Sequence, residues 1–506
     1  MNYKMLRYVT GQLLIAEGIL MLLPLVTSLI YGEFGMLHAF LIPMAALFLI
    51  GFLLSFKKPE NKTLRAQDGF VVVGLSWIIM SAFGCLPFII SGLIPNFVDA
   101  YFETVSGFTT TGATVLESAD FAKLWDPATS QTGLRGVFLW RSFTNWIGGM
   151  GILVLVLAIM PQQDMKSSRL IHIMRAEMPG PKVDKVVATV KKTAAIMYGI
   201  YIALTAFMAV LLLFGGMDLY EALCTSMSTA GTGGLAIWSD SMASFSTSSV
   251  AFPEYCVWVV AIFMCVFSIN FNLFYLIITG KALTALLSEE LRWFVGIVLV
   301  GTAFVTFNVT FSSLAVYDNL GDGLRHAFFQ ISTIMSSTGF ATDDFNLWPN
   351  ASKMVLLSLM FVGACAGSTG GGIKISRIVI AFKSTWSEIR HMIHPRRVKK
   401  VMFENKSVDT DTKRGVFAYM VAYVLIFVAS FLVIAIVDGK SVETTFSAVT
   451  TCINNMGPGL DEVGPSASFM GLSYVSKIVL ILDMLLGRLE IFPILLLFYP
   501  TVWKER

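Results

Sequence analysis

The sequence has little charge and none of the residue clusters that typify metal centres. Only 14% of its 506 residues are charged, whereas 56% are apolar and the mean hydropathy is +0.73. Because soluble domains are about a quarter charged, this composition excludes a string of soluble domains and indicates one membrane domain. The six cysteines form no CxxC pair and the five histidines have no ligand spacing, so neither a metal site nor a disulfide framework is expected.

Long apolar runs make up most of the chain. A spanning helix needs about 20 mostly apolar residues. Ten segments qualify, at 10–31, 36–56, 69–94, 135–160, 193–215, 253–280, 293–316, 353–381, 414–437 and 475–500. Four shorter segments rich in glycine, serine and threonine lie between them, at 99–115, 219–237, 322–342 and 441–459. Because they are too short to span, we expect them to enter the membrane, turn back and line one water-filled pathway.

Lysine and arginine are absent after three of these glycine-rich segments, from 238–254, 341–352 and 457–476. Basic residues gather instead at 57–65, 166–192 and 390–414. Because positive charge marks the cytoplasmic side, we expect both termini and the basic loops in the cytoplasm, with the short segments entering from outside. The basic loops either set this topology alone or also form a docking surface for a cytosolic partner or anionic lipid.

Each short segment ends in a similar string of residues. The strings are Thr110-Thr111-Gly112-Ala113-Thr114, Thr232-Gly233-Gly234-Leu235-Ala236, Ser337-Thr338-Gly339-Phe340-Ala341 and Asn455-Met456-Gly457-Pro458-Gly459. Their central glycines are 122, 105 and 118 residues apart, which indicates a fourfold internal repeat. Backbone carbonyls around an axis can replace the hydration shell of potassium, and glycine supplies the dihedral angles that point them inward. The four strings therefore predict one cation-selectivity filter.

Together with four further motifs, these strings resemble the TrkH-type subunits of the Trk/Ktr/HKT superfamily of potassium transporters. The motifs are Asn145–Gly151, Asn270–Asn272, Gly367–Lys374 and Gly487–Glu490. The resemblance covers essentially the whole chain. It implies an all-α membrane protein with four tandem helix–pore loop–helix repeats around one central pore, plus two extra N-terminal transmembrane helices. The expected units are the helix pair 1–66 and the repeats 67–165, 166–285, 286–400 and 401–506.

The resemblance also implies which residues form the filter within this single subunit. The expected K⁺-binding residues are Thr110, Thr111, Gly112, Thr232, Gly233, Gly234, Ser337, Thr338, Gly339, Asn455, Met456 and Gly457. Serine at the first glycine position accompanies sodium permeation in some relatives, so Gly112 favours potassium. The fourth loop lacks the threonine of the others, and the ring is therefore not expected to be symmetric.

A glycine-rich string interrupts the eighth apolar run. It resembles a phosphate-binding loop, but its lysine is misplaced and its flanks are membrane helices. Close helix packing through small residues is the simplest interpretation. The resemblance implies in addition an intramembrane gate beneath the filter within the third repeat, with Lys374 pinning its cytoplasmic end. The expected gate residues here are Gly367, Ser368, Thr369, Gly370, Gly371, Gly372 and Lys374.

Arg488 lies inside the last apolar run, where a charge must face partners or water. One interpretation is a structural ion pair with Asp483 or Glu490. The resemblance implies a second role as a gate residue, in which its charge forms an electrostatic barrier in the pore below the filter. The two interpretations are compatible.

The sequence thus predicts potassium uptake across a plasma membrane. No nucleophile with an organised base and no soluble catalytic domain is present, so we do not expect an enzyme. The expected ligand is K⁺, with Rb⁺ as its substitute, and no cofactor is expected in this chain. Symport with sodium or protons and poorly selective K⁺/Na⁺ permeation stay open. An inverted-repeat transporter is disfavoured because all four strings enter from the same side.

The resemblance implies partners and a location as well. We expect a multi-pass protein of the bacterial inner membrane that forms a homodimer and does not bind nucleic acid. A cytosolic nucleotide-binding ring of the TrkA or KtrA type is the expected regulator. The basic segment 383–414 is our hypothesis for part of its docking surface, with Arg396, Arg397, Lys399 and Lys400 at its centre.

Overall fold

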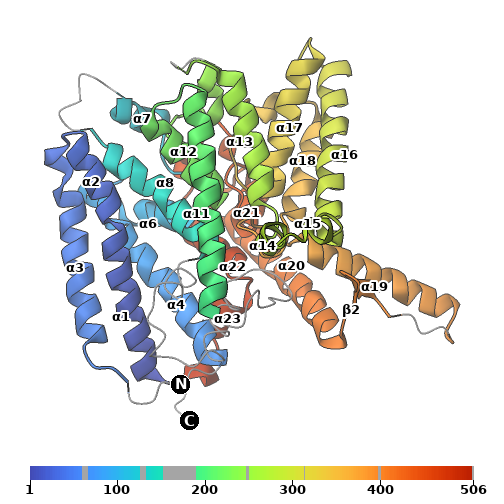
Figure 1. The fold of residues 1–506 in the computed structure, drawn as a ribbon, viewed down its shortest axis with the longest axis horizontal. Helices are drawn as coiled ribbons and strands as arrows, with labels where there is room; N and C mark the ends of the chain where they lie inside the picture. The colour runs from blue at the N-terminus through green and yellow to red at the C-terminus, as the bar shows by residue number, and fades with distance from the viewer. Residues whose placement is uncertain are drawn as a thin grey trace.

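The structure is a computed structural model that describes residues 1–59, 66–125, 133–151, 190–246, 250–312, 314–396 and 400–503. Helices dominate it, as Figure 1 shows, and the described residues form a sheet only in one two-stranded hairpin. The all-α class predicted from the sequence is confirmed. The predicted divisions between units stay predictions, and the one at 165–166 lies outside the described residues.

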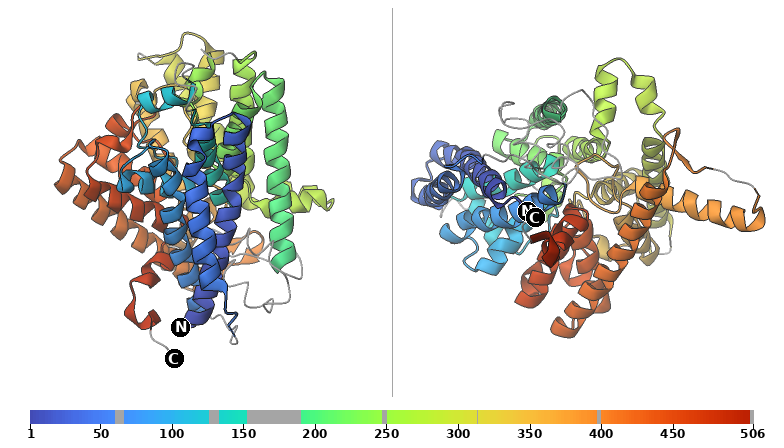
Figure 2. Two further views of the ribbon diagram at one scale, coloured as in Figure 1. Left: turned by 90° about the vertical axis from the view of Figure 1, so that its left-hand side faces the viewer. Right: turned by 90° about the horizontal axis from the view of Figure 1, so that it is seen from below.

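An antiparallel helical pair lies at one side of the bundle (Figures 1 and 2), with α1 (Tyr3–Leu20) and α2 (Leu22–Ile30) in one arm and α3 (His38–Ser55) in the other. The short helix η1 (Phe34–Met36) lies between the two arms in the chain. Helices α1 and α3 approach each other closely at two glycines. A Cβ atom on Gly11 would lie 2.8 Å from the Gly51 carbonyl oxygen, and one on Gly51 would lie 2.8 Å from that of Gly11. Small residues thus hold this pair together, as is common between membrane helices.

The first two repeats follow in chain order. The first contains α4 (Ala66–Gly84), α5 (Leu86–Ile90), α6 (Phe97–Phe108), α7 (Ser118–Trp125) and α8 (Arg135–Met150). The second contains α11 (Val190–Phe214), α12 (Leu219–Gly231), η4 (Ser241–Ser246), α13 (Pro253–Phe267), α14 (Phe271–Ile278) and α15 (Ala282–Leu286). Of the predicted basic loop at 166–192, residues 166–189 lie outside the described residues.

The other two repeats are joined by the hairpin. The third contains α16 (Glu289–Phe311), α17 (Leu320–Ser336), η5 (Phe345–Leu347), α18 (Asn350–Val362) and α19 (Ile375–Ile393). The hairpin consists of β1 (Met402–Phe403) and β2 (Lys406–Ser407), and α19 before it projects away from the bundle (Figure 2). The fourth repeat contains α20 (Thr410–Asp438), α21 (Val442–Asn454), η6 (Asp461–Val463), η7 (Phe469–Gly471), α22 (Tyr474–Arg488), α23 (Phe492–Leu497) and η8 (Pro500–Trp503).

Six described helical segments are long and apolar enough to cross a membrane, by length and composition. A seventh counts if α13 and α14 form one span, although they meet at an angle of 93°. Three predicted spans are therefore broken helices and not single rods. The span at 253–280 breaks at Asn270, whose side chain caps α14, the span at 353–381 breaks between α18 and α19, and the span at 475–500 breaks between α22 and α23. Of the span at 135–160, residues 152–160 lie outside the described residues.

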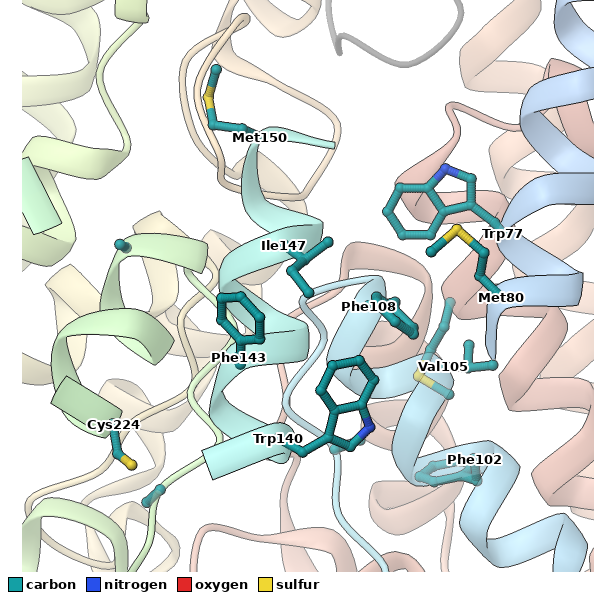
Figure 3. Close-up of a cluster of buried hydrophobic side chains, with 14 of the residues drawn as sticks. Trp77, Met80, Phe102, Val105, Phe108, Trp140, Phe143, Ile147, Met150 and Cys224 are labelled. Atoms are coloured by element: carbon teal, nitrogen blue, oxygen red, sulfur yellow. The ribbon is translucent and has the colours of Figure 1, made fainter. Parts of the chain in front are cut away.

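The first short helix, α6, is wedged into an apolar core (Figure 3). Phe102, Val105 and Phe108 of α6 are buried between α4 and α8. The Trp140 side chain of α8 packs edge-on against Phe108, with ring centroids 6.1 Å apart, and its Nε1 donates to the Gly84 carbonyl at 2.9 Å. Close packing of this kind holds α6, and the loop that follows it, in one position.

Candidate functional site

The four short helices α6, α12, α17 and α21, here called the pore helices, begin in the same way. A side chain caps the first turn of each, and asparagine, aspartate and serine are the residue types that do this best. The capping residues are Asn96, Asp218, Asn319 and Ser441. The sequence therefore fixes where each pore helix starts, just after a spanning segment.

The pore helices also end in the same way. The second residue before each central glycine has a left-handed backbone conformation, with φ between 53° and 59°: Thr110, Thr232, Ser337 and Asn455. The next residue donates its N–H to a carbonyl five residues back, at 2.8–3.0 Å. This is a Schellman motif, which usually has glycine at the left-handed position. A non-glycine residue there costs about 1–2 kcal/mol, so four such residues mark a strained site.

The central glycines Gly112, Gly234, Gly339 and Gly457, here called the ring glycines, face one another's loops. All four have positive φ, between 63° and 90°. A Cβ atom on Gly112 would collide with the Gly233 carbonyl oxygen, and one on Gly234 would collide with that of Thr338.

The same relation continues through the third and fourth loops. A Cβ atom on Gly339 would collide with the Met456 carbonyl oxygen, and one on Gly457 would lie 3.0 Å from that of Thr111. Each loop therefore abuts the next, and the fourth abuts the first. The four loops form a closed ring of backbone carbonyls around one axis, and the structure brings all twelve residues predicted for the filter together there.

A pocket opens on the ring and is lined by all four ring glycines. Its wall also contains Arg141, which sequence reasoning missed. The Arg141 Nε donates to Glu103 Oε1 at 2.6 Å, and its guanidinium reaches the Ala236 carbonyl at 2.5 Å. Glu103 in turn accepts from the Val115 N–H at 2.9 Å. This buried ion pair braces the chain just after the first and second ring glycines.

The fourth loop lacks threonine but has a brace of its own. The Asn455 side-chain amide donates to Thr111 Oγ1 at 3.0 Å and to the Met484 carbonyl at 2.8 Å. The fourth loop is thereby tied to the first loop and to α22. The fourth loop therefore differs from the others in its contacts, and its unequal share in K⁺ binding stays a prediction.

Residues 363–374 between α18 and α19, here called the glycine loop, lie directly against the ring. The Gly371 N–H donates to Ser337 Oγ at 2.5 Å, and the Gly372 N–H donates to the Asn454 carbonyl at 3.0 Å. Lys374 is buried and its ammonium donates back to the Gly370 carbonyl. The structure thus places Gly371 and Gly372 of the predicted gate in contact with the ends of the third and fourth pore helices, whereas the Gly367 carbonyl accepts from the Phe271 N–H of α14.

Arg488 joins the glycine loop to the first loop of the ring. Its guanidinium donates to the Thr369 carbonyl at 2.8 Å, to Thr110 Oγ1 at 3.2 Å, and to the carbonyls of Gly148 and Gly149 at the end of α8. Its side chain is buried, so a positive charge sits beneath the ring.

The two acidic residues that the sequence offered as ion-pair partners of Arg488 contact other side chains. Glu490 pairs with Arg377 of α19, and Asp483 accepts from Ser430 Oγ at 2.8 Å. Arg377 also lies over the Tyr419 ring, with its guanidinium carbon 4.1 Å from the centroid. Sequence reasoning missed Arg377, although a charged residue next to a glycine-rich intramembrane string is a signal that would have found it.

Comparisons with known proteins show what the whole chain is similar to. The TrkH family model, described as a cation transport protein, matches residues 36–504. The Trk system potassium uptake protein TrkH of Salmonella typhimurium is 34% identical over 510 residues, with 100% of both chains covered. The Trk system potassium uptake protein TrkG of Escherichia coli is 34% identical over 513 residues with the same coverage. The crystal structure of the potassium transporter TrkH from Vibrio parahaemolyticus matches with a TM-score of 0.85, at 29% identity and 100% coverage of both chains.

Proposed function

Because the chain belongs to the TrkH family of cation transport proteins, we propose that it carries potassium ions into the bacterial cell through the ring of four loops. The observation that supports this most is the closure of the ring, in which every ring glycine abuts a carbonyl of a neighbouring loop. Carbonyls in such a ring replace the water around a potassium ion. The C-terminal ends of four pore helices point their negative partial charge at the same place.

The proposed location is the inner membrane, with both termini in the cytoplasm. The chain is a multi-pass membrane protein with several apolar helices of spanning length. Its basic segments support the orientation, because positive loops stay in the cytoplasm. The N- and C-termini lie at the same end of the molecule (Figure 2), as this orientation requires.

The glycine loop and Arg488 are proposed as the gate. The loop fills the space against the ends of two pore helices, and the Arg488 charge beneath the ring repels cations that have left it. Both obstacles must move before an ion can pass. Arg488 is hydrogen-bonded to the loop, so the two would move together.

Removal of the Arg488 charge should therefore increase ion flux. We predict that Arg488→Ala raises ⁸⁶Rb⁺ uptake into proteoliposomes roughly tenfold, the effect of lowering a barrier by about 1.4 kcal/mol. Arg488→Lys keeps the charge but loses the planar fork that reaches several carbonyls. Low flux in the lysine variant indicates that the Arg488 charge is an electrostatic barrier. High flux indicates that Arg488 acts through its hydrogen bonds, which hold the glycine loop in place. Unchanged or lower flux in the well-expressed alanine variant would rule out Arg488 as a gate.

The coupled and poorly selective alternatives predict different results in the same vesicles. If transport is symport, an imposed sodium or proton gradient should drive rubidium uptake even when there is no potassium gradient. Poorly selective permeation requires sodium to compete with rubidium at similar concentrations. Passive selective uptake, which we propose, shows neither behaviour.

A further inference from the structure

A buried carboxylate in the first turn of α16 holds both sides of the glycine loop. The Glu290 side chain is almost fully buried, and its Oε1 accepts from the Ala366 N–H at 2.8 Å and from the Ser376 N–H at 3.2 Å. Ala366 lies in the first half of the loop, and Ser376 lies just after its end. One carboxylate oxygen therefore ties the two sides of the loop to a helix outside it.

The contact with Ser376 replaces a missing helix cap. The backbone N–H groups at the start of a helix lack partners within the helix. Lys374 occupies the capping position of α19 with φ at 79° and makes no side-chain cap. Glu290 supplies an acceptor there from another helix, and its negative charge also suits the positive end of α19. The start of α19 and the glycine loop thus share one anchor.

The hairpin fixes the position of this anchor from the cytoplasmic side. Glu404 in its turn accepts from Ser288 Oγ at 2.7 Å and from the Glu290 N–H at 2.9 Å, which caps α16. On the other side, the Lys383 ammonium of α19 donates to the Met402 carbonyl at 2.9 Å and pairs with Glu289. The hairpin is therefore bonded to α16, which carries Glu290, and to α19, whose first turn Glu290 caps.

We propose that Glu290 is a positioning residue that clamps the glycine loop against the ring, and that the hairpin of residues 402–407 holds this clamp in place. The inference rests on the proposed role of the glycine loop as the gate. It adds a route by which a force on the basic segment 383–414 reaches that gate. If the hairpin moves, Glu404 leaves the start of α16, Glu290 shifts, and the Ala366 and Ser376 N–H groups are released.

The first test is ⁸⁶Rb⁺ uptake by the full chain in proteoliposomes. Glu290→Ala removes the acceptor of both hydrogen bonds, and we expect basal uptake to rise roughly tenfold because the loop is held less firmly. Glu290→Gln keeps an acceptor oxygen and should retain low uptake. Glu388→Ala is the control for the same change of side chain, because Glu388 is an exposed glutamate of α19.

The second test follows the loop itself and does not depend on ion flux. Cys365 lies in the glycine loop next to Ala366 and is buried. In a variant that keeps Cys365 as its only cysteine, labelling by a membrane-permeant maleimide reports how often the loop opens. Labelling should accelerate severalfold in Glu290→Ala and stay unchanged in Glu388→Ala. Equal labelling in the two variants would overturn the clamp.

The two tests separate the clamp from the gate. Faster labelling without increased uptake would support the clamp and contradict the glycine loop as the gate. Glu404→Ala tests the hairpin and leaves the Glu290 side chain intact. If Glu290→Ala does not fold, this variant still tests whether the clamp holds the glycine loop. It should accelerate labelling of Cys365, and combining it with Glu290→Ala should add little, because both act through one contact. Additive effects would overturn the role of the hairpin.

Discussion

Arg141 places a positive charge in the wall of the pocket on the ring, which is the proposed entrance for cations. Glu103 is buried beside it and neutralises this charge. The same carboxylate holds Thr114 and Val115, so it serves both the electrostatics and the geometry of the first loop. A buried pair of this kind is costly to break, because the remaining charge is left unpaired.

We predict that Glu103→Gln weakens the apparent affinity for rubidium. Glutamine still offers an oxygen to the Val115 N–H, but the Arg141 charge is no longer balanced at the entrance. The KM for ⁸⁶Rb⁺ uptake should rise roughly fivefold at low ionic strength and less at high salt, because salt screens the charge. The double variant Glu103→Gln/Arg141→Gln should recover most of the affinity. A KM that is unchanged at every salt concentration would refute the electrostatic part of this account.

At the residue scale, the sequence predicted the ring and the glycine loop but not their supports. The ring residues occur in strings that repeat along the chain, so they are visible without a structure. The supporting pairs have no such spacing. Glu103 and Arg141 are 38 residues apart, Glu290 and Ala366 are 76 apart, and Arg377 and Glu490 are 113 apart. Only the fold brings them into contact.

At the scale of helices, hydropathy predicted where the chain is apolar but not where helices break. The run at 253–280 is apolar throughout, yet it turns by 93° because the Asn270 side chain accepts from the Asn272 N–H and starts a new helix. Polar caps and glycines that break a helix at membrane depth are satisfied by neighbouring helices. Those neighbours, and hence the breaks, cannot be predicted from one segment alone.

The helix α19 and the segment after it carry the proposed docking surface. Exposed apolar side chains such as Phe382 and Met392 lie on α19, which projects from the bundle. Arg396 and Lys400 follow it, whereas Arg397 and Lys399 lie outside the described residues. Basic and apolar groups together suit a protein partner with an acidic surface, such as the proposed nucleotide-binding ring.

We predict that reversing the charge of Arg396, Arg397, Lys399 and Lys400 weakens binding of that ring roughly tenfold or more in a pull-down with the purified partner. The control reverses the same number of charges at Lys4, Arg7, Lys57 and Lys58. If both variants bind the partner as the parent chain does, the docking surface lies elsewhere. If both lose binding equally, attraction is general and not specific to this segment.

At the scale of the whole molecule, the last repeat closes against the first. Helix α22 packs on α6, and α23 packs on α4. Lys477 of α22 pairs with Asp99 of α6 at 2.6 Å, and both side chains are almost fully buried. The ring of loops can close only if the first and the last repeat meet. The Lys477–Asp99 pair lies at the contact between these two repeats.

We predict that Lys477→Met destabilises the protein by about 3–5 kcal/mol, because it leaves the Asp99 carboxylate buried and unpaired. The thermal unfolding midpoint of the detergent-solubilised protein measures this loss. Lys477→Met/Asp99→Leu should recover most of it. Lys440→Met, which breaks an exposed pair with Glu462, is the control and should change the midpoint little. Equal midpoints for Lys477→Met and the control would show that the contact between the first and last repeats does not depend on this pair.

The central claim is that the ring of four loops selects potassium. Its most direct test compares ⁸⁶Rb⁺ with sodium uptake into proteoliposomes for the parent chain, Gly112→Ser and Gly296→Ala. Gly296 lies in α16, and a Cβ atom added there would meet no side chain or other segment within 4 Å, so its variant controls for a general effect of adding a Cβ atom.

Serine at Gly112 must adopt a φ of +83° and collides with the Gly233 carbonyl. We therefore predict that the parent chain and Gly296→Ala prefer rubidium and that Gly112→Ser reduces this preference roughly tenfold. Selective uptake that is unchanged by Gly112→Ser would contradict the account, because the ring would then not be the filter.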